Sequence, residues 1–390
     1  MSNTLLTKNI TEVLPSKADL EKRLSSAPIK IYLGIDPSAP ILHLGHAVVL
    51  RKLREFQDTG HKIILLVGDF TGMIGDPSDR TAARKKLTRE EVRENAKTYK
   101  EQAEKILRFS GKNPVEIKFN SEWLSKLTFE EVVELASNVT VQQMLERDFF
   151  QKRLQENKPI HLHEFLYPLM QGYDSVALDV DAEIGGTDQT FNMLVGRTLM
   201  KTLKGKEKFV ISVPLLEGLD GRKMSKSFGN FVAITDPPTD MFGKIMSVND
   251  NLVDRYFELA TQLSFEEIQS IKQENTHPMD LKKRLSLEIV KLYHGEKAAD
   301  KAKDEFQAVF REGEGPTDAV VYKTATGSVN LITVLVEAGM VQSNSEARRL
   351  IAQGGVEWEG EKVRQETLEI SGPGTLRVGK HRFLKIEMEK

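Results

Sequence analysis

Short apolar runs and stretches of helical periodicity follow one another along the first half of the chain. The run 62–69 reads K-I-I-L-L-V-G-D, which is typical of a strand buried on both faces of a parallel sheet. Between 47 and 56, by contrast, apolar residues recur at the spacing of one helix face. Strands are predicted at 29–35, 62–69, 115–119, 177–184 and 208–213. This alternation predicts an α/β fold with a Rossmann-like, doubly wound parallel sheet.

The rest of the periodicity is helical and divides the chain. A helix capped by Thr88 is predicted over 88–109, and a helical insertion over about 121–173. More helices are predicted at 188–203, 241–247, 252–262, 265–273, 281–293 and 296–310. The pattern predicts an α/β domain over 1–236, an α-helical domain over 237–312, a linker over 313–328 and a small α+β module over 329–390.

Composition narrows the class of protein. The chain has 390 residues and 39% hydrophobic content, which is enough for several globular cores. Its 55 Lys and Arg nearly balance its 57 Asp and Glu, so any contact with nucleic acid depends on local basic patches. The chain has no cysteine and no run resembling a signal peptide or membrane span, so we expect a cytoplasmic protein with no membrane contact.

The segment H-L-G-H at 43–46 is the first candidate for chemistry. His43 and His46 lie at i and i+3, which puts both imidazoles on one face of the first turn of a helix. A helix N-terminus that follows a parallel strand is suited to bind phosphate. By itself, such a pair is as often a surface feature as a functional one.

A second candidate is the loop L-D-G-R-K-M-S-K-S at 219–227. Lys223 and Lys226 are separated by small residues, and serines and backbone amides of such a loop can surround an anion. A solvated basic loop is the alternative. Two phosphate-suited segments in one chain nevertheless favour a nucleotide site.

Polar residues at three further places complete the candidate site. Asp76 lies in a tight loop after the second strand, where it binds an ammonium group or stabilises the turn. Tyr167, Gln171 and Asp174 share one helical face, which lines a pocket or makes hydrogen bonds within the core. In G-G-T-D-Q at 185–189, Asp188 suits ribose hydroxyls. His161 and His163 lack a third ligand, so no metal site is predicted.

Together, H-L-G-H and K-M-S-K-S resemble the paired signature of class I aminoacyl-tRNA synthetases. The other segments resemble bacterial-type tyrosyl-tRNA synthetases, down to T-G-M-I-G-D-P at 71–77 and G-G-T-D-Q. Two positions depart from the family pattern: Val49 stands where some relatives have threonine, and Glu183 where others have glutamine. The C-terminal segment 343–356, a capped basic helix followed by short strands, resembles an RNA-binding module of a small-subunit ribosomal protein.

The resemblance implies roles for individual residues. In the family, Tyr32 and Asp174 would bind the substrate phenol, and Asp76, Tyr167 and Gln171 its ammonium. The full set implied for tyrosine is Tyr32, Gly34, Asp36, Asp76, Tyr167, Gln171, Asp174 and Gln189. The set implied for ATP is His43, Gly45, His46, Gly186, Asp188, Lys223, Met224, Ser225, Lys226 and Ser227. His43, His46, Lys223 and Lys226 would be catalytic, and Arg348, Arg349 and Lys380 would bind RNA.

The implied reaction is the ATP-dependent joining of tyrosine to tRNA(Tyr), with Mg²⁺ accompanying ATP, no tightly bound cofactor and a homodimeric enzyme. The helices after residue 237 would bind the anticodon. Two alternatives remain: a tryptophanyl enzyme of the same fold, whose pocket would accept an indole N–H, and a non-catalytic RNA-binding protein built on the same scaffold.

Overall fold

The computed structural model describes residues 5–77, 87–224, 228–274, 277–312, 320–324, 327–341, 343–370, 372–379 and 382–388. Contacts divide the chain into two compact units. The first comprises residues 1–236 and 248–270, and the second comprises 237–247 and 271–390. None of the described helices has the length and apolar character that a membrane crossing requires.

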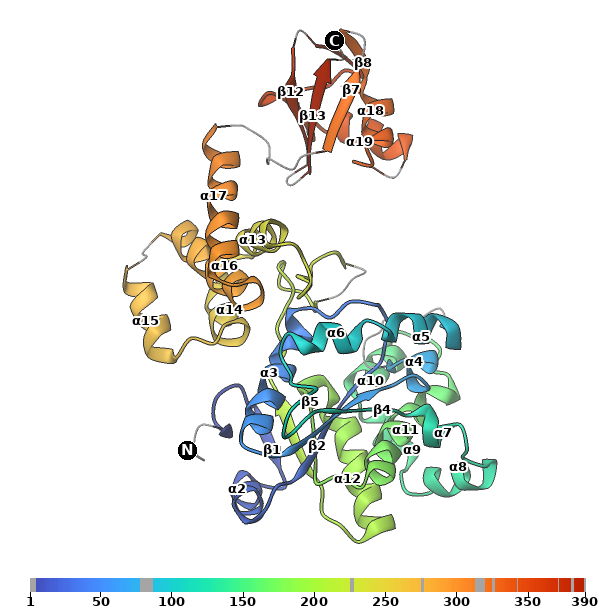
Figure 1. Ribbon diagram of the computed structural model, residues 1–390. Coiled ribbons are helices and arrows are strands. Elements are labelled where there is room, and N and C mark those ends of the chain that lie inside the picture. Colours follow the sequence, from blue (N-terminus) through green and yellow to red (C-terminus); the bar gives the residue numbers. More distant parts are fainter. Residues whose placement is uncertain are drawn as a thin grey trace. The chain divides into compact units, whose positions relative to one another are not determined.

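The first unit is built on a six-stranded sheet in the order β1-β6-β5-β2-β3-β4, with helices on both sides (Figure 1). The strands are β1 (Glu12–Leu14), β2 (Lys30–Ile35), β3 (Lys62–Val67), β4 (Glu116–Phe119), β5 (Ala182–Gly186) and β6 (Phe209–Val213). The five strands from β2 to β6 are parallel, which confirms the predicted doubly wound sheet. Strand β1 was not predicted and pairs antiparallel with β6 at the edge.

The strand order reverses at β2, which lies between β5 and β3. In open parallel sheets, ligands bind outside the carboxyl ends of the strands at such a reversal. The chain leaves β2 towards α3 and leaves β5 towards the 3₁₀ turn η2 (Thr187–Gln189). The candidate segments that follow these strands therefore meet at one edge of the sheet.

Helices make up most of the remainder of this unit. They are α2 (Lys17–Ser26), α3 (Leu44–Asp58), α4 (Thr71–Ile74), α5 (Arg89–Ala96), α6 (Tyr99–Glu104), α7 (Ser121–Leu124), α8 (Phe129–Ala136), α9 (Val141–Leu145), α10 (Asp148–Gln155), α11 (Leu162–Leu178), α12 (Thr190–Lys204), the 3₁₀ turn η4 (Asp250–Leu252) and α14 (Val253–Ala260). Helix α15 (Phe265–Glu274) begins in this unit. The predicted helix 88–109 is two helices, α5 and α6, and Thr88 caps the first through a reciprocal bond with Glu91.

The predicted strand 177–184 was wrong at its start. Helix α11 continues to Leu178 and ends at Asp179, whose φ of 49° turns the chain out of the helix. Strand β5 therefore begins only at Ala182. Pro168 lies inside α11.

The second unit begins with three helices that pack on one another: α13 (Pro238–Met246), α16 (Pro278–His294) and α17 (Glu296–Glu312). Phe242 of α13 is buried, and its ring centroid lies 5.3 Å from that of Phe306 of α17. These helices match the predicted helical region closely in their bounds.

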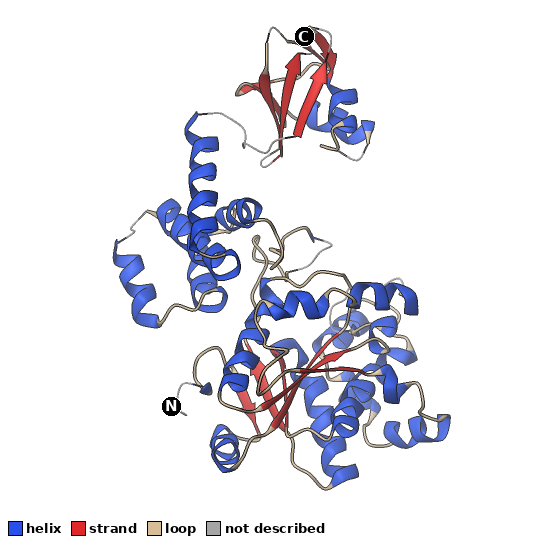
Figure 2. Ribbon diagram, viewed as in Figure 1, coloured by secondary structure: helices blue, strands red, loops and turns tan. Residues whose placement is uncertain are grey.

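The C-terminal module has a sheet in the order β10-β9-β12-β13-β7 and a two-stranded sheet, β11-β8, with two helices (Figure 2). Its elements are β7 (Val320–Thr324), β8 (Ser328–Asn330), α18 (Leu331–Glu337), α19 (Asn344–Ala352), β9 (Val356–Trp358), β10 (Glu361–Lys362), β11 (Thr367–Glu369), β12 (Gly374–Val378) and β13 (Arg382–Met388). Strand β7 pairs in parallel with β13, so part of the expected linker 313–328 belongs to this sheet.

Candidate active site

The two histidines lie together at the start of α3. His43 is the N-cap residue, and its backbone N–H donates to His46 Nδ1 at 3.1 Å. The two ring centroids are 3.9 Å apart. Burial, with a smaller effect of Lys223, lowers the pKa of His46 to about 4, and burial also lowers the pKa of His43. At neutral pH burial therefore favours the uncharged form of both imidazoles, and the nearby positive charge is that of Lys223.

The lysine loop approaches the same helix start. Met224 is buried, and a carbon added at Gly45 would lie 3.7 Å from its sulfur. Lys223 Nζ lies 2.9 Å from Asp188 Oδ2. Burial lowers the pKa of Lys223, while Asp76 opposes that shift. Residues Ser225, Lys226 and Ser227 lie outside the described residues.

The segment after β5 faces the loop after β3. Gln189 Nε2 donates to Asp76 Oδ2 at 2.7 Å. Burial, and then the negative charge of Asp76, raise the pKa of Asp188 to about 6. A carbon added at Gly186 would lie 2.6 Å from Asp188 Oδ1, so the glycine allows this aspartate its position. The acidic residues expected for ribose and for ammonium are thus neighbours.

A second polar group lies deeper, between β2 and α11. Tyr32 is 0% exposed, and its hydroxyl lies 2.9 Å from Ser175 Oγ. Asp174 is also buried, and its carboxylate accepts hydrogen bonds from Trp123 Nε1 at 2.7 Å and Asn120 Nδ2 at 3.2 Å. Burial raises the pKa of both Tyr32 and Asp174. The negative charges of Glu183 and then of Asp174 add to the increase in the pKa of Tyr32.

Open space lies beside this polar group. Gly34 is exposed although it lies in the middle of the sheet, and a carbon added there would have no neighbour closer than 4.0 Å. Tyr167 donates to Asp36 Oδ2 at 2.9 Å, and Thr71 donates to Asp36 Oδ1 at 2.6 Å. The end of β2 is thereby tied to α11 and α4.

Several residues at the site were missed by sequence reasoning. They are Trp123, Asn120, Ser175, Lys208 and Arg147. One of them, Lys208, carried a signal, because a charge inside an apolar strand segment needs a partner, and Glu183 in the neighbouring strand segment is a candidate. The others lie in the helical insertion or on helices without a recognisable motif.

Among the missed residues, Arg147 is a buried cation near the acidic residues of the site. It is 7% exposed, and its guanidinium lies 4.3 Å from the Phe149 ring and 4.7 Å from the Phe191 ring. Burial lowers the pKa of Arg147, and the charges of Asp76 and Asp188 oppose this shift. The site thus has a cation that is independent of the lysine loop.

The residues expected to bind RNA belong to the second unit. Arg348 and Arg349 are exposed on α19, and Arg348 Nε lies 3.5 Å from Glu366. Lys380 lies outside the described residues. Among the described residues, no group of three His, Cys, Asp or Glu side chains could hold a metal ion. His161 and His163 stack on each other with centroids 5.7 Å apart.

Comparison with known proteins gives the family. A family profile described as tRNA synthetases class I (W and Y) matches residues 24–311. A second profile, described as the SYY-like C-terminal domain of tyrosine–tRNA ligase, matches residues 313–380. The chain belongs to the class I tRNA synthetases of the tryptophan and tyrosine group.

Curated relatives are similar over nearly their whole length. The tyrosine–tRNA ligase of Geobacter metallireducens is 50% identical, over 98% of this chain and 97% of that protein. The tyrosine–tRNA ligase of Thermotoga maritima is 47% identical, over 98% and 96%. The tyrosine–tRNA ligase of Haemophilus influenzae is 48% identical, over 100% of this chain and 98% of that protein.

Solved structures share the fold at lower identity. A C-terminally truncated mitochondrial tyrosyl-tRNA synthetase from Aspergillus nidulans has a TM-score of 0.66 at 23% identity, over 78% of this chain and 93% of that one. Tyrosyl-tRNA synthetase from Archaeoglobus fulgidus, complexed with L-tyrosine, has a TM-score of 0.60 at 23% identity, over 77% and 98%.

Proposed function

We propose that this chain is a tyrosine–tRNA ligase, which activates L-tyrosine with ATP and transfers it to tRNA(Tyr). The observation that carries the proposal is the pairing of Tyr32 with Asp174. Both are buried, the charge of Asp174 acts on the Tyr32 hydroxyl, and Gly34 leaves space beside the Tyr32 ring. The helix start and the lysine loop suited to phosphate lie at the carboxyl edge of the same sheet. A site built to hydrogen-bond a hydroxyl rejects an analogue that lacks it, and tyrosyl-tRNA synthetases are a known example.

The chemistry needs positioning more than covalent help. A carboxylate oxygen of tyrosine attacks the α-phosphorus of ATP, and the bond to the bridging oxygen breaks as pyrophosphate leaves with the negative charge. A terminal ribose hydroxyl of the tRNA then attacks the carbonyl carbon of the adenylate and releases AMP. Both steps depend on holding the reactants in line and stabilising the growing charge.

We assign the tyrosine-binding residues to two ends of the slot. Tyr32 and Asp174 meet the phenol, and Asp76, Tyr167 and Gln171 meet the ammonium. The hydrogen bonds from Tyr167 to Asp36 and from Gln189 to Asp76 support this assignment, because they fix these groups before the substrate arrives. Gly34 leaves the space for the substrate ring.

We assign ATP to the edge where the helix start, the G-G-T-D-Q turn and the lysine loop meet. His43 and His46 donate to phosphate oxygens, Asp188 accepts from the ribose, and Lys223 and Lys226 stabilise the charge of the leaving pyrophosphate. Mg²⁺ is proposed to accompany ATP, since this ion is held in nucleotide sites largely by phosphate oxygens and water. The cytoplasmic location stays a prediction.

ATP–pyrophosphate exchange with a full panel of amino acids tests the function. Exchange should respond to tyrosine alone. A response to tryptophan instead would favour the other specificity of this family, and no response to any amino acid would favour a non-catalytic RNA-binding protein.

Transfer to tRNA is proposed to use the parts beyond residue 237. The α-helical domain over 237–312 would bind the anticodon, and the module that follows would contact RNA through Arg348, Arg349 and Lys380. The exposure of both arginines on α19 supports this role. We propose the same domain bounds as the sequence predicted, except that the sheet of the C-terminal module begins at β7, within the expected linker.

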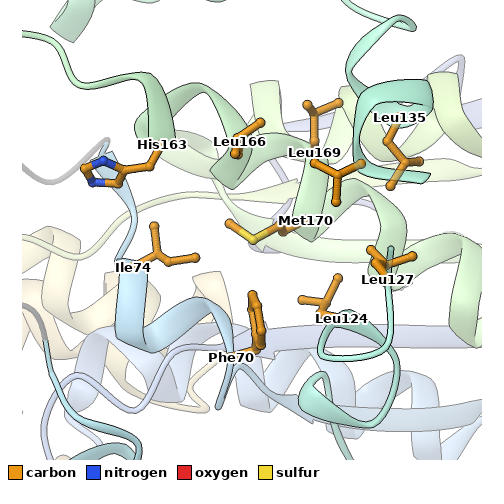
Figure 3. Close-up of a pocket in the computed structure, with 10 residues that line it drawn as sticks. Phe70, Ile74, Leu124, Leu127, Leu135, His163, Leu166, Leu169 and Met170 are labelled. Atoms are coloured by element: carbon orange, nitrogen blue, oxygen red, sulfur yellow. The ribbon is translucent and has the colours of Figure 1, made fainter. Parts of the chain in front are cut away.

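We further propose that the enzyme is a homodimer formed through α8 and α11. These helices help to line an apolar cavity of about 210 Å³ (Figure 3). It is bounded by Phe70, Ile74, Leu124, Leu127, Val132, Leu135, His163, Leu166, Leu169 and Met170. The same two helices expose Phe129 (85%) and Leu162 (78%). A patch with both a cavity and protruding apolar side chains suits a self-complementary contact with a second copy.

Molar mass in solution tests this interface. The double variant Phe129→Asp/Leu162→Asp should be a monomer by light scattering, while the unchanged chain is a dimer. Phe265→Asp is the matched control, because Phe265 is also exposed (67%) but lies on α15. A monomeric control variant or a dimeric double variant would contradict this interface and indicate that it lies on another surface.

A further inference from the structure

Lys208 is a charged side chain in the interior, behind the proposed tyrosine slot. It precedes β6 and is 0% exposed. Its Nζ donates to Ser175 Oγ at 2.8 Å and to the Met193 carbonyl at 3.1 Å, and it forms an ion pair with the Glu183 carboxylate. An ammonium group has three hydrogens and accepts none, so these contacts use its whole capacity.

This ion pair is a weak source of stability. Desolvation of two buried charges offsets most of their attraction, and apolar residues of similar volume often serve a core better. Space is nevertheless kept for it, since a carbon added at Gly196 would lie 2.5 Å from Lys208 Nζ. The pair also touches the slot, because Gln171 Nε2 donates to Glu183 Oε1 at 2.9 Å.

The contacts of Lys208 restrict the direction of the neighbouring hydrogen bonds. Because Lys208 can only donate, Ser175 Oγ must accept from it. The single hydrogen of Ser175 then has two acceptors to choose from, the Tyr32 hydroxyl at 2.9 Å and Glu183 Oε2 at 3.4 Å. Lys208 occupies one of the two lone pairs of Ser175 Oγ, and the Tyr32 oxygen is the nearer acceptor for the Ser175 hydrogen, which favours Ser175 as the donor to Tyr32.

We propose that Lys208 is a positioning residue for amino-acid specificity, which makes the Tyr32 hydroxyl a donor towards the ligand. Bonds then run in one direction: Lys208 to Ser175, Ser175 to Tyr32, Tyr32 to the phenol oxygen of the substrate, and the phenol hydroxyl to Asp174. A donor that cannot accept lies at one end, and an acceptor carboxylate lies at the other. This inference rests on the proposed tyrosine specificity.

The direction matters most when phenylalanine enters the slot. Tyr32 cannot turn and donate to Ser175, because the hydrogen of Ser175 already points at it. Its remaining acceptors are the Gln171 carbonyl, at the long distance of 3.4 Å, and the Glu183 carboxylate, which already accepts from Lys208 and Gln171. A buried donor left without a good partner is costly, so the complex with phenylalanine is penalised. Without Lys208, Ser175 could accept from Tyr32 and the penalty would fall.

The test is the ratio of kcat/KM for tyrosine to that for phenylalanine in ATP–pyrophosphate exchange. In the double variant Lys208→Met/Glu183→Gln, which removes both charges of the buried pair, this ratio should fall roughly tenfold, about the effect of one hydrogen bond. The KM for ATP should not change. Lys208→Gln is a second variant that keeps a polar group able to accept as well as donate, and it should lower the ratio too.

Lys52→Met is the matched control. Lys52 is also a buried lysine (1% exposed), but it contacts Glu55 and the Leu5 carbonyl, away from the slot. Its loss should leave the ratio unchanged. Equal losses with tyrosine and phenylalanine in a folded Lys208 variant would overturn the proposal, because a structural role alone lowers both.

The unchanged chain separates this inference from the function on which it rests. If it does not respond to tyrosine, the proposed function is wrong and the hydrogen-bond chain falls with it. If it prefers tyrosine and both Lys208 variants keep the full ratio, only the role of Lys208 is wrong.

Discussion

Asp174 is held in place by two donors before any substrate arrives, Trp123 Nε1 and Asn120 Nδ2. Replacing Asp174 with alanine removes the acceptor proposed for the phenol. A hydrogen bond to a charged group contributes about 1.5–3 kcal/mol, so the KM for tyrosine should rise roughly 10- to 100-fold. The KM for ATP should stay the same in the exchange assay. An equal rise in both constants would contradict the proposed role.

Asp188 gives the site a dependence on pH. Its pKa is raised to about 6, so lowering the pH through 6 protonates it and weakens its bonds to a ribose and to Lys223. The KM for ATP should rise below about pH 6, and Asp188→Asn should show no such inflection. Because folding favours the protonated form, the contribution of Asp188 to stability is lost as the pH rises through about 6. An inflection that persists in the asparagine variant would assign it to another group.

For single residues, the sequence predicted the side chains expected to contact a ligand. It did not predict the side chains that position them. His43, Asp76 and Asp188 stood in recognisable segments after strands, and the structure brings them to one edge of the sheet. Trp123 and Ser175 had no such signal, because their role depends on which helix packs behind β2. Tertiary packing of that kind cannot be derived from local spacing.

Among the elements, α8 offers a direct test of local helix chemistry. Thr128 Oγ1 accepts from the Glu131 backbone N–H at 3.2 Å, and Glu131 Oε2 accepts from the Thr128 N–H at 2.7 Å. Thr128→Ala should cost about 1 kcal/mol and lower the hydrogen-exchange protection of α8 amides about fivefold. Thr128→Ser keeps the hydroxyl and should retain the protection. Similar losses in both variants would mean that the cap contributes little.

Element boundaries show where sequence patterns stop being sufficient. The apolar run after Ala177 was read as one strand, but its first residues finish α11 and only the part from Ala182 enters the sheet. Helix and strand have the same apolar composition when both are buried. The left-handed turn at Asp179 decides between them, and aspartate gives only a weak signal for that conformation.

At the scale of the whole molecule, the chain is nearly neutral and must meet tRNA through local charge. Arg348→Glu/Arg349→Glu should weaken tRNA charging and leave tyrosine-dependent exchange unchanged. The slope of log affinity against log salt should become shallower by about 2, one for each lost phosphate contact. Undiminished charging would remove α19 from the proposed RNA surface.

The tyrosine slot joins residues that are far apart in the order of synthesis. Tyr32 belongs to β2, made early, whereas Lys208 precedes β6, which completes the parallel sheet. A ribosome-bound nascent chain that stops short of Lys208 lacks β6 and the lysine behind the proposed slot, so it should bind no tyrosine. Binding of tyrosine would then indicate that β6 has joined the sheet. The pocket would become able to bind only late in the synthesis of the chain.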